Sequence, residues 1–412
     1  MNEKMKSSIG YHTFSIFQNL SPEEESDLHR CFSDYKQKND QMDKCPAKNK
    51  GQIIGKIYFY NNKTGIRWLV INRVVKGGFG KTFSIIGVIA TITPKVLLNK
   101  DYIAIATKSD IQEIKVAFND EAHRISPILG DFDSYSASRG DYCANFCLDE
   151  LEIPCTSERM MKLIKMGNIP THYEERTEYV ERIENDKKTT SHRKKADPNS
   201  FYLISGSVVV NCYNKDAHLK NDEKHPCENK EDAKNLIRFE LQFSNRKLHA
   251  MSKTPIYLAS EPESLTPTFL TEQEVDEFCR DLMTRQRPAL RIDAFLSDTI
   301  CVEVIDKYFR KIVRSGDYYT LDKARHMIKM SHFRPKREEK LIKALEMTND
   351  HRGIHKTKLR LMGKDLAEYK RMLNELDKLG INPVTIPQAW RIEKIPNMLN
   401  AYYGKCAEVH KP

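Results

Sequence analysis

The stretch "SRGDYCANF", residues 138–146, decides the fold that we expect from this sequence. Successive side chains of a β-strand point to opposite faces. One face of this stretch therefore carries the more polar set Arg139, Asp141, Cys143 and Asn145. The other face carries Gly140, Tyr142, Ala144 and Phe146. The pattern predicts a strand that buries one face and displays an arginine and a carboxylate on the other.

The stretch "NLIRFELQF", residues 235–243, repeats this pattern, with Arg238 and Glu240 on the face opposite Phe239. Mg²⁺ and Mn²⁺ bind one or two carboxylates together with water and phosphate oxygens. We therefore predict Asp141 and Glu240 as ligands of one such ion, with Arg139 and Arg238 binding a phosphate through their planar guanidinium groups. The alternative is Arg–carboxylate pairing without any ligand.

A third strand, within "GSVVVNCYNK" at residues 206–215, favours the ligand-binding interpretation. Val208, Val210 and Cys212 form its apolar side. The opposite side carries residue types that bind phosphate or DNA, continuing past the strand to a lysine. This set is Ser207, Asn211, Tyr213 and Lys215.

The rest of the chain predicts an α+β fold, in which an antiparallel sheet with packed helices precedes a basic, mainly helical C-terminal region. Further strands are expected at 52–60, 66–75, 83–92 and 101–107, and helices after Ser21, after Lys108 and near 156–167. C-terminal helices are expected at 272–285, 298–314, 320–331, 335–350 and 362–379. We divide the chain into a polar segment 1–50, a β-rich core 51–260, a linker or surface loop 261–297 and a helical region 298–412.

The positive charge is concentrated in the helical region. The net charge is +10, and residues 307–380 alone contain 20 Lys or Arg against 10 Asp or Glu. Such clustering indicates a phosphate-facing surface, for which we select Lys323, Arg325, Arg334, Lys336 and Arg337. The alternative is a basic helical bundle that only packs on the sheet.

The stretch "VVKGGFGKTF", residues 74–83, resembles half of a P-loop but has Val75 where the first glycine is required. The residues that follow are β-branched, so a glycine-rich hairpin is the better interpretation and no nucleotide cofactor is expected. The ten cysteines include no C-x-x-C pair, so Cys143, Cys147 and Cys155 are expected to be buried thiols in a reducing cytoplasm. We expect no membrane partner and no signal peptide.

A metal ion, cations and phosphate suggest phosphodiester chemistry, which requires an attacking group. Tyr308, Tyr318 and Tyr319 are the candidates in residues 301–324, and Lys311 shares a helical face with Tyr308. Nearby cations would stabilise the negative charge that develops when a tyrosine attacks phosphorus. Periodicity does not choose among the three.

The four stretches "SRGDYCANF", "FYLISGSVVVNCYNK", "NLIRFELQF" and "YFRKIVRSGDYYTLDKA" occur in an order that resembles rolling-circle replication initiators, of the filamentous-phage and Rep_trans group. The resemblance covers about residues 85–405. It implies an antiparallel-sheet nicking domain, Asp141 and Glu240 as metal ligands, and Tyr308 as the nucleophile because "YFRK" fits the tyrosine–lysine motif. The chain lacks the H-x-H motif of the wider superfamily, so its metal site would be carboxylate-based.

The resemblance implies a metal-dependent nicking-closing endonuclease that links a tyrosine to a 5′ phosphate and leaves a 3′ hydroxyl as primer. Its expected partners are double-stranded origin DNA, the nicked single strand, and a host helicase and polymerase in a bacterial cytoplasm; a homodimer is compatible with it. The alternatives are a relaxase of a conjugative element and a non-catalytic origin-binding protein.

Overall fold

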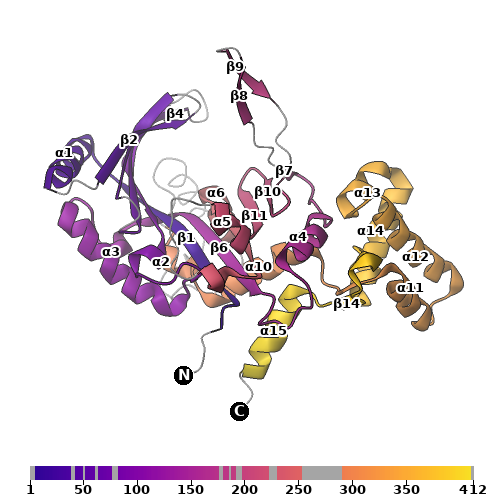
Figure 1. Ribbon diagram of the computed structural model, residues 1–412. Helices are drawn as coiled ribbons and strands as arrows, with labels where there is room; N and C mark the ends of the chain where they lie inside the picture. The colour runs from indigo at the N-terminus through magenta and orange to yellow at the C-terminus, as the bar shows by residue number, and fades with distance from the viewer. Residues whose placement is uncertain are drawn as a thin grey trace, which may run out of the picture. The chain divides into compact units, whose positions relative to one another are not determined.

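Figure 1 shows the computed structural model of the chain, which divides into two compact units. The N-terminal unit comprises residues 9–143 and 242–302, and the C-terminal unit comprises residues 1–8, 144–241 and 303–412. The structure describes residues 5–38, 42–49, 52–60, 64–76, 82–175, 180–184, 187–191, 197–221, 230–252 and 290–409.

The N-terminal unit is built on a sheet whose strands follow the order β2-β3-β4-β5-β1-β6. These strands are β1 (Ser8–Asn19), β2 (Met42–Asn49), β3 (Gln52–Tyr60), β4 (Ile66–Lys76), β5 (Thr82–Ile92) and β6 (Ser136–Cys147), whose last residues belong to the C-terminal unit. Each pair from β2 to β1 is antiparallel. Such pairs need only short connections, which suits the close spacing of β2, β3, β4 and β5 along the chain.

Two helices, α1 (Pro22–Lys38) and α3 (Ile111–Ile125), cover this sheet and bury aromatic side chains against it (Figure 1). Phe32 of α1 stacks on Tyr58 with ring centroids 4.3 Å apart. Phe118 of α3 lies 5.4 Å from Trp68 of β4. Aromatic rings bury large apolar areas, so these contacts form the main core of the unit.

The C-terminal unit continues from β6 and β12 (Leu236–Ser244) to β11 (Val208–Asn214), β10 (Ser200–Ile204) and β7 (Glu174–Glu175), in that order. Helix α10 (Asp298–Val313) packs Phe309 against Phe146 of β6 and Phe239 of β12, with ring centroids 5.4 Å apart in both pairs. Helix α4 (Ser157–Lys165) packs on β11. The apolar face of these strands is thus covered by helices, and the polar side chains lie on the opposite face.

The helical region of the C-terminal unit centres on α12 (Pro335–Asp350), which packs against α11 (Leu321–Met330), α13 (Ile354–Arg360) and α14 (Gly363–Lys378). A two-stranded pair, β13 (Tyr318–Tyr319) and β14 (Lys394–Ile395), and helix α15 (Met398–Val409) complete it. The remaining described α-helices and strands are α2 (Pro94–Leu97), α5 (Lys215–Asn221), α6 (Asn245–Met251), α9 (Ile292–Phe295) and the antiparallel hairpin β8 (Val180–Glu184) with β9 (Lys187–Ser191).

The predicted α+β class is confirmed, together with the strands at 52–60, 66–75 and 83–92 and the hairpin of β10 and β11. Ser21 begins α1 as predicted, because its hydroxyl accepts from the Glu24 N–H while the Glu24 carboxylate accepts from the Ser21 N–H. The helices expected at 298–314, 320–331, 335–350 and 362–379 are also present. Cys143 and Cys147 are buried, as predicted, and Cys155 is half-buried.

One strand prediction is wrong: residues 101–107 form turns, with only an isolated bridge from Ala106 to Tyr11. Strand β1 was not expected, although Tyr11, Phe14 and Ile16 are completely buried. The Lys76 and Thr82 ends of β4 and β5 face each other as a hairpin requires, whereas residues 77–81 lie outside the described part of the chain, as does the helix expected at 272–285.

Candidate active site

A tyrosine and a carboxylate meet on the polar face of the C-terminal unit. The Tyr213 hydroxyl of β11 donates to Glu240 Oε1 of β12, at 2.8 Å. Tyr213 is half-buried and Glu240 is 8% exposed. The neighbouring positions of β11 alternate as expected, with Val210 and Cys212 buried and Asn211 and Tyr213 half-buried. This alternation directs the Tyr213 phenol away from the helices that cover the apolar face.

Arg238, two residues before Glu240 on β12, is completely buried. Its Nε donates to Asn145 Oδ1 of β6 at 2.7 Å, and its Nη1 lies 3.9 Å from Glu240 Oε1. A buried cation is tolerated only where charge and hydrogen-bond acceptors surround it. Asn145 supplies one acceptor, and the Glu240 carboxylate supplies negative charge at a distance too long for a hydrogen bond, so charge attraction draws the carboxylate toward the guanidinium group. We refer to Tyr213, Glu240, Arg238 and Asn145 as the Tyr213 cluster.

Further polar groups surround the Tyr213 ring. Lys215, the first residue of α5, is 2% exposed, and its Nζ lies 5.6 Å from the ring centroid. The His218 ring lies 5.2 Å from the same centroid, at a tilt. A cation over an aromatic face is attracted by the ring quadrupole. The phenol therefore lies between a carboxylate at its hydroxyl and two basic side chains near its ring.

The other predicted carboxylate, Asp141, belongs to the N-terminal unit and pairs with Arg139. Arg139 Nε donates to Asp141 Oδ1 at 2.7 Å, and its Nη2 donates to Oδ2. The bidentate geometry is the strong form of an Arg–carboxylate pair. Asp141 is 3% exposed, whereas the Arg139 side chain is 39% exposed.

The expectation that these strands display their polar face to solvent is wrong. Asp141 and Asn145 are buried, and Arg238 is completely buried, so Arg238 contacts Asn145 and Glu240 and not solvent. The Arg238 Nε and the Asp141 carboxylate have hydrogen-bond partners, which offsets part of the cost of burying these groups. Because Arg238 and Lys215 are buried, we do not expect either one to bind a phosphate directly. Their expected role is to position the neighbouring Glu240 and Tyr213 side chains. Ser207 and Asn211 remain half-buried.

The first predicted nucleophile, Tyr308 of α10, has a different environment. It is 7% exposed, and burial and the hydrogen bond that it donates to Tyr173 raise its pKa above the usual range. Lys311 Nζ lies 5.8 Å from the Tyr173 ring centroid. Tyr308 and Lys311 therefore both lie next to Tyr173. A raised pKa disfavours the phenolate form that would attack phosphorus.

Tyr318 and Tyr319 form β13 and are also buried. Tyr318 is 1% exposed, and burial raises its pKa. Tyr319 is 8% exposed, with Lys394 Nζ 5.9 Å from its ring centroid. Both residues hold β13 against β14, which is the packing role that buried tyrosines commonly have.

The predicted DNA-binding side chains of α11 and α12 differ in their partners. Arg325 pairs with Glu346 at 2.6 Å and with Asp322 at 3.3 Å, and Arg337 pairs with Glu375. Lys323, Arg334 and Lys336 are exposed. The two ion-paired arginines are already neutralised locally, which reduces what they offer to a phosphate.

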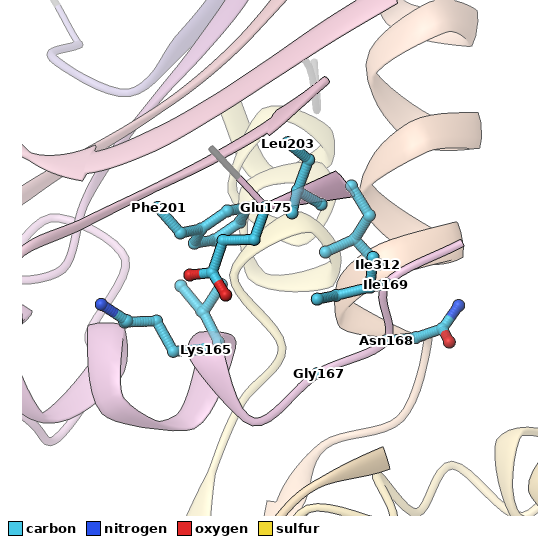
Figure 2. Close-up of a pocket in the computed structure, with 9 residues that line it drawn as sticks. Lys165, Gly167, Asn168, Ile169, Glu175, Phe201, Leu203 and Ile312 are labelled. Atoms are coloured by element: carbon cyan, nitrogen blue, oxygen red, sulfur yellow. The ribbon is translucent and has the colours of Figure 1, made fainter. Parts of the chain in front are cut away.

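A small pocket of the C-terminal unit contains none of the predicted site residues. Figure 2 shows it between α4, β10 and α10, lined mainly by the apolar side chains of Ile164, Phe201, Leu203 and Ile312. Lys165 at its edge donates to the backbone carbonyls of Asp197 and Ser200, so this lysine is committed to structure. The Tyr213 cluster, and not this pocket, therefore remains the candidate active site.

Tyr213 was expected from the sequence to contact phosphate and was not considered as a nucleophile. The sequence feature that could have identified Tyr213 is its place on the polar side of a predicted strand, near the end of that strand and two residues before Lys215. Within the described residues, no group of three or more His, Cys, Asp or Glu side chains is arranged to hold a metal ion. A Mg²⁺ site needs only one or two carboxylates from the protein.

The chain matches no protein-family model, no curated protein and no solved structure. In the part of the chain that the structure describes, none of the helices has the length and apolarity needed to span a bilayer.

Proposed function

We propose that this protein is a replication initiator that nicks one strand of a double-stranded DNA origin, with Tyr213 as the nucleophile. The observation that carries the proposal is the 2.8 Å hydrogen bond from the Tyr213 hydroxyl to Glu240, backed by the buried Arg238. A hydroxyl nucleophile needs a base within hydrogen-bond reach, and the base needs a third group that orients it. The Tyr213 cluster contains all three parts.

Tyr213 replaces Tyr308 in this proposal because their partners differ. Tyr308 donates to another phenol, and its raised pKa keeps it protonated. Tyr213 donates to a carboxylate and is more accessible than Tyr308. The order of motifs along the chain supports the class of reaction, and the contact with Glu240 supports this choice of tyrosine.

In the proposed reaction the Tyr213 oxygen attacks a phosphodiester phosphorus of one DNA strand. The bond from Tyr213 Oη to phosphorus forms, the bond from phosphorus to the 3′ oxygen breaks, and the phenolic proton passes to the Glu240 carboxylate. The departing 3′ oxygen takes a proton from water. No redox change occurs, and the reverse reaction reseals the strand, which explains why no nucleotide hydrolysis is required.

Glu240 also suits a divalent metal, because its carboxylate oxygens are the hard ligands that Mg²⁺ and Mn²⁺ prefer. Asp141 remains a ligand predicted from the sequence alone. A bound ion would supply positive charge next to the phosphate and lower the pKa of an oxygen nucleophile. Arg238 and Asn145 then act on the protein side, by holding Glu240 in a fixed position.

The test is incubation with a supercoiled plasmid that carries the replicon's own origin, with Mn²⁺ or Mg²⁺ and without ATP. We expect relaxed plasmid and a covalent protein–DNA adduct that survives denaturing electrophoresis. Wild-type protein that binds the origin but yields neither product would identify a non-catalytic origin-binding protein instead. Adduct formation that depends strictly on ATP would also contradict the proposal.

A further inference from the structure

The segment 352–364, which contains α13 and the turn into α14, is strongly basic. It carries Arg352, Lys356, Lys358, Arg360 and Lys364 and no Asp or Glu. We call it the basic turn. Figure 1 shows α13 in the helical region of the C-terminal unit, where it packs on α12. The sequence prediction placed the DNA contacts elsewhere, on α11 and α12.

The inner side of the basic turn is fixed by packing and by hydrogen bonds. Ile354 and Thr357 are completely buried, and the Ile354 N–H donates to the Met166 carbonyl at 2.8 Å. Gly353 has a φ of 130°, and a Cβ there would lie 2.6 Å from the same carbonyl oxygen, so only glycine fits. Lys358 Nζ donates to Asn168 Oδ1 at 2.9 Å. Helix α13 is therefore held firmly, and its other side faces outward.

The outward side carries exposed cations that are not neutralised. Arg352, Lys356, Arg360 and Lys364 are exposed, and within the described residues no side-chain ion pair or hydrogen bond involves them. On α11 and α12, in contrast, Arg325 and Arg337 pair with glutamates. Unpaired cations on a rigid surface are the groups that release counterions when they bind phosphates.

Two large apolar side chains project between these cations. Leu359 is 72% exposed and Met362 is 84% exposed, more than any other large hydrophobic side chain in the described part of the chain. Exposed apolar side chains on a fixed turn gain free energy when a partner covers them. DNA-binding proteins use Leu and Met in this way, as side chains that enter the minor groove and contact base steps.

We propose that the basic turn is a contact surface for double-stranded DNA, in which Arg352, Lys356, Arg360 and Lys364 bind backbone phosphates and Leu359 and Met362 enter a groove. The proposal rests on the proposed function, which makes duplex DNA the substrate. The unpaired positive charge favours a polyanion as the partner. The exposed Leu359 and Met362 side chains favour a nucleic acid, because its bases offer apolar surface inside a groove.

The first experiment measures binding of the full-length chain to a fluorescent mixed-sequence duplex of about 30 base pairs over a range of salt concentrations. The double substitution R352Q/R360Q is compared with R325Q/R337Q, which removes two arginines that are already ion-paired. Each lost phosphate contact lowers the slope of log affinity against log salt by about 0.9. We expect a decrease of about 2 for R352Q/R360Q and little change for R325Q/R337Q. Equal decreases would overturn the proposal.

The second experiment tests the apolar pair with L359A/M362A. We expect an affinity about tenfold lower at an unchanged salt slope, because only apolar contact is lost. A duplex that contains 2-aminopurine should fluoresce more with protein whose basic turn is unchanged than with this variant, since the probe brightens when its base step is unstacked. Unaltered affinity and fluorescence would remove the apolar pair from the interface.

Two further outcomes separate this inference from its alternatives. Tighter binding to vesicles of anionic lipid than to duplex, lost in the same variants, would assign the basic turn to a membrane and overturn the proposal.

All binding is measured with Y213F protein, so nicking does not interfere. If the arginine pairs differ as expected but no adduct forms with wild-type protein, the inference survives while the proposed chemistry fails; the reverse result rejects the inference alone.

Discussion

Tyr213 is half-buried and Tyr308 is buried in the same unit, and their hydroxyl groups have different partners. Tyr213 donates to a carboxylate that is held by a buried arginine, whereas Tyr308 donates to the phenol of Tyr173. Burial raises the pKa of a phenol and so disfavours its phenolate form. The comparison teaches that a reactive tyrosine is identified by the group that receives its proton.

The largest expected effect comes from removing the Tyr213 hydroxyl, compared with removing the Tyr308 hydroxyl. Tyr213→Phe removes the proposed attacking oxygen and should lower adduct formation by more than about a thousandfold. Denaturing electrophoresis of the labelled protein–DNA adduct measures this, with Tyr308→Phe as the matched control. If Y213F forms the adduct at the wild-type rate while Y308F does not, the comparison is reversed and Tyr308 is the nucleophile.

The second effect concerns the proton acceptor. Glu240→Gln keeps the size of the side chain but loses its charge and basicity, so we expect nicking to fall by about 10²- to 10⁴-fold. Titration calorimetry with Mn²⁺ on the same variant tests the metal-binding role. Glu231→Gln, at a side chain that is 91% exposed in the same unit, is the control. Wild-type nicking and Mn²⁺ affinity in E240Q would show that Glu240 serves neither purpose.

The third effect tests the support beneath the carboxylate. Asn145→Ala removes the acceptor of the Arg238 Nε hydrogen bond and should destabilise the chain by about 1–3 kcal/mol. Nicking should fall less than in E240Q, because the variant displaces Glu240 without removing it. Chemical denaturation and single-turnover nicking measure the two quantities. A loss of stability with a wild-type nicking rate would show that Arg238 and Asn145 contribute to folding and not to nicking.

A smaller effect is expected for Tyr308→Phe. The lost hydrogen bond to Tyr173 should reduce the free energy of unfolding by about 0.5–1.5 kcal/mol, with nicking changed less than about twofold. Chemical denaturation at neutral pH provides the value. No measurable destabilisation would mean that the phenol–phenol hydrogen bond contributes nothing to the free energy of unfolding.

The smallest effect is a difference in pH dependence. The folded-state pKa of Tyr308 is raised above the unfolded value of 10.0, so above about pH 10 the unfolded chain releases this proton first. Tyr308 therefore adds to stability below pH 10, and that contribution is lost as pH rises toward its folded pKa. Wild-type protein should lose stability above pH 10 more steeply than Y308F. Identical slopes in alkaline denaturation would contradict the raised pKa.

Much of the fold follows from local sequence. The alternation in "SVVVNCYN" predicts β11 and its two faces, and Ser21 with Glu24 predicts the start of α1. These features depend on residues a few positions apart. Strand β1 was not predicted because its apolar residues are interrupted by His12, Thr13 and Ser15, and only the covering elements decide that Thr13 and Ser15 are buried. Residues 101–107 show the converse, since this apolar run forms turns and meets strand β1 only at the isolated bridge from Ala106 to Tyr11.

The candidate site was predicted only in part for the same reason. Glu240 and Arg238 were selected from an i, i+2 pattern within one strand, and they do lie together in the structure. The hydrogen bond from Tyr213 to Glu240 joins positions 27 residues apart and requires β11 to lie next to β12. A pattern along one strand contains no information about which strand becomes its neighbour.

The sequence by itself determined the α+β class, the alternating faces of the central strands, the arginine and carboxylate at residues 238 and 240, and the concentration of positive charge after residue 307. Only the tertiary structure decided that Glu240 receives the Tyr213 hydroxyl, that Arg325 and Arg337 are neutralised by glutamates, and that the cations of the basic turn are not. The physical reason is range: propensity, capping and alternation act between near neighbours, whereas burial and side-chain pairing depend on contacts between segments that only folding brings together.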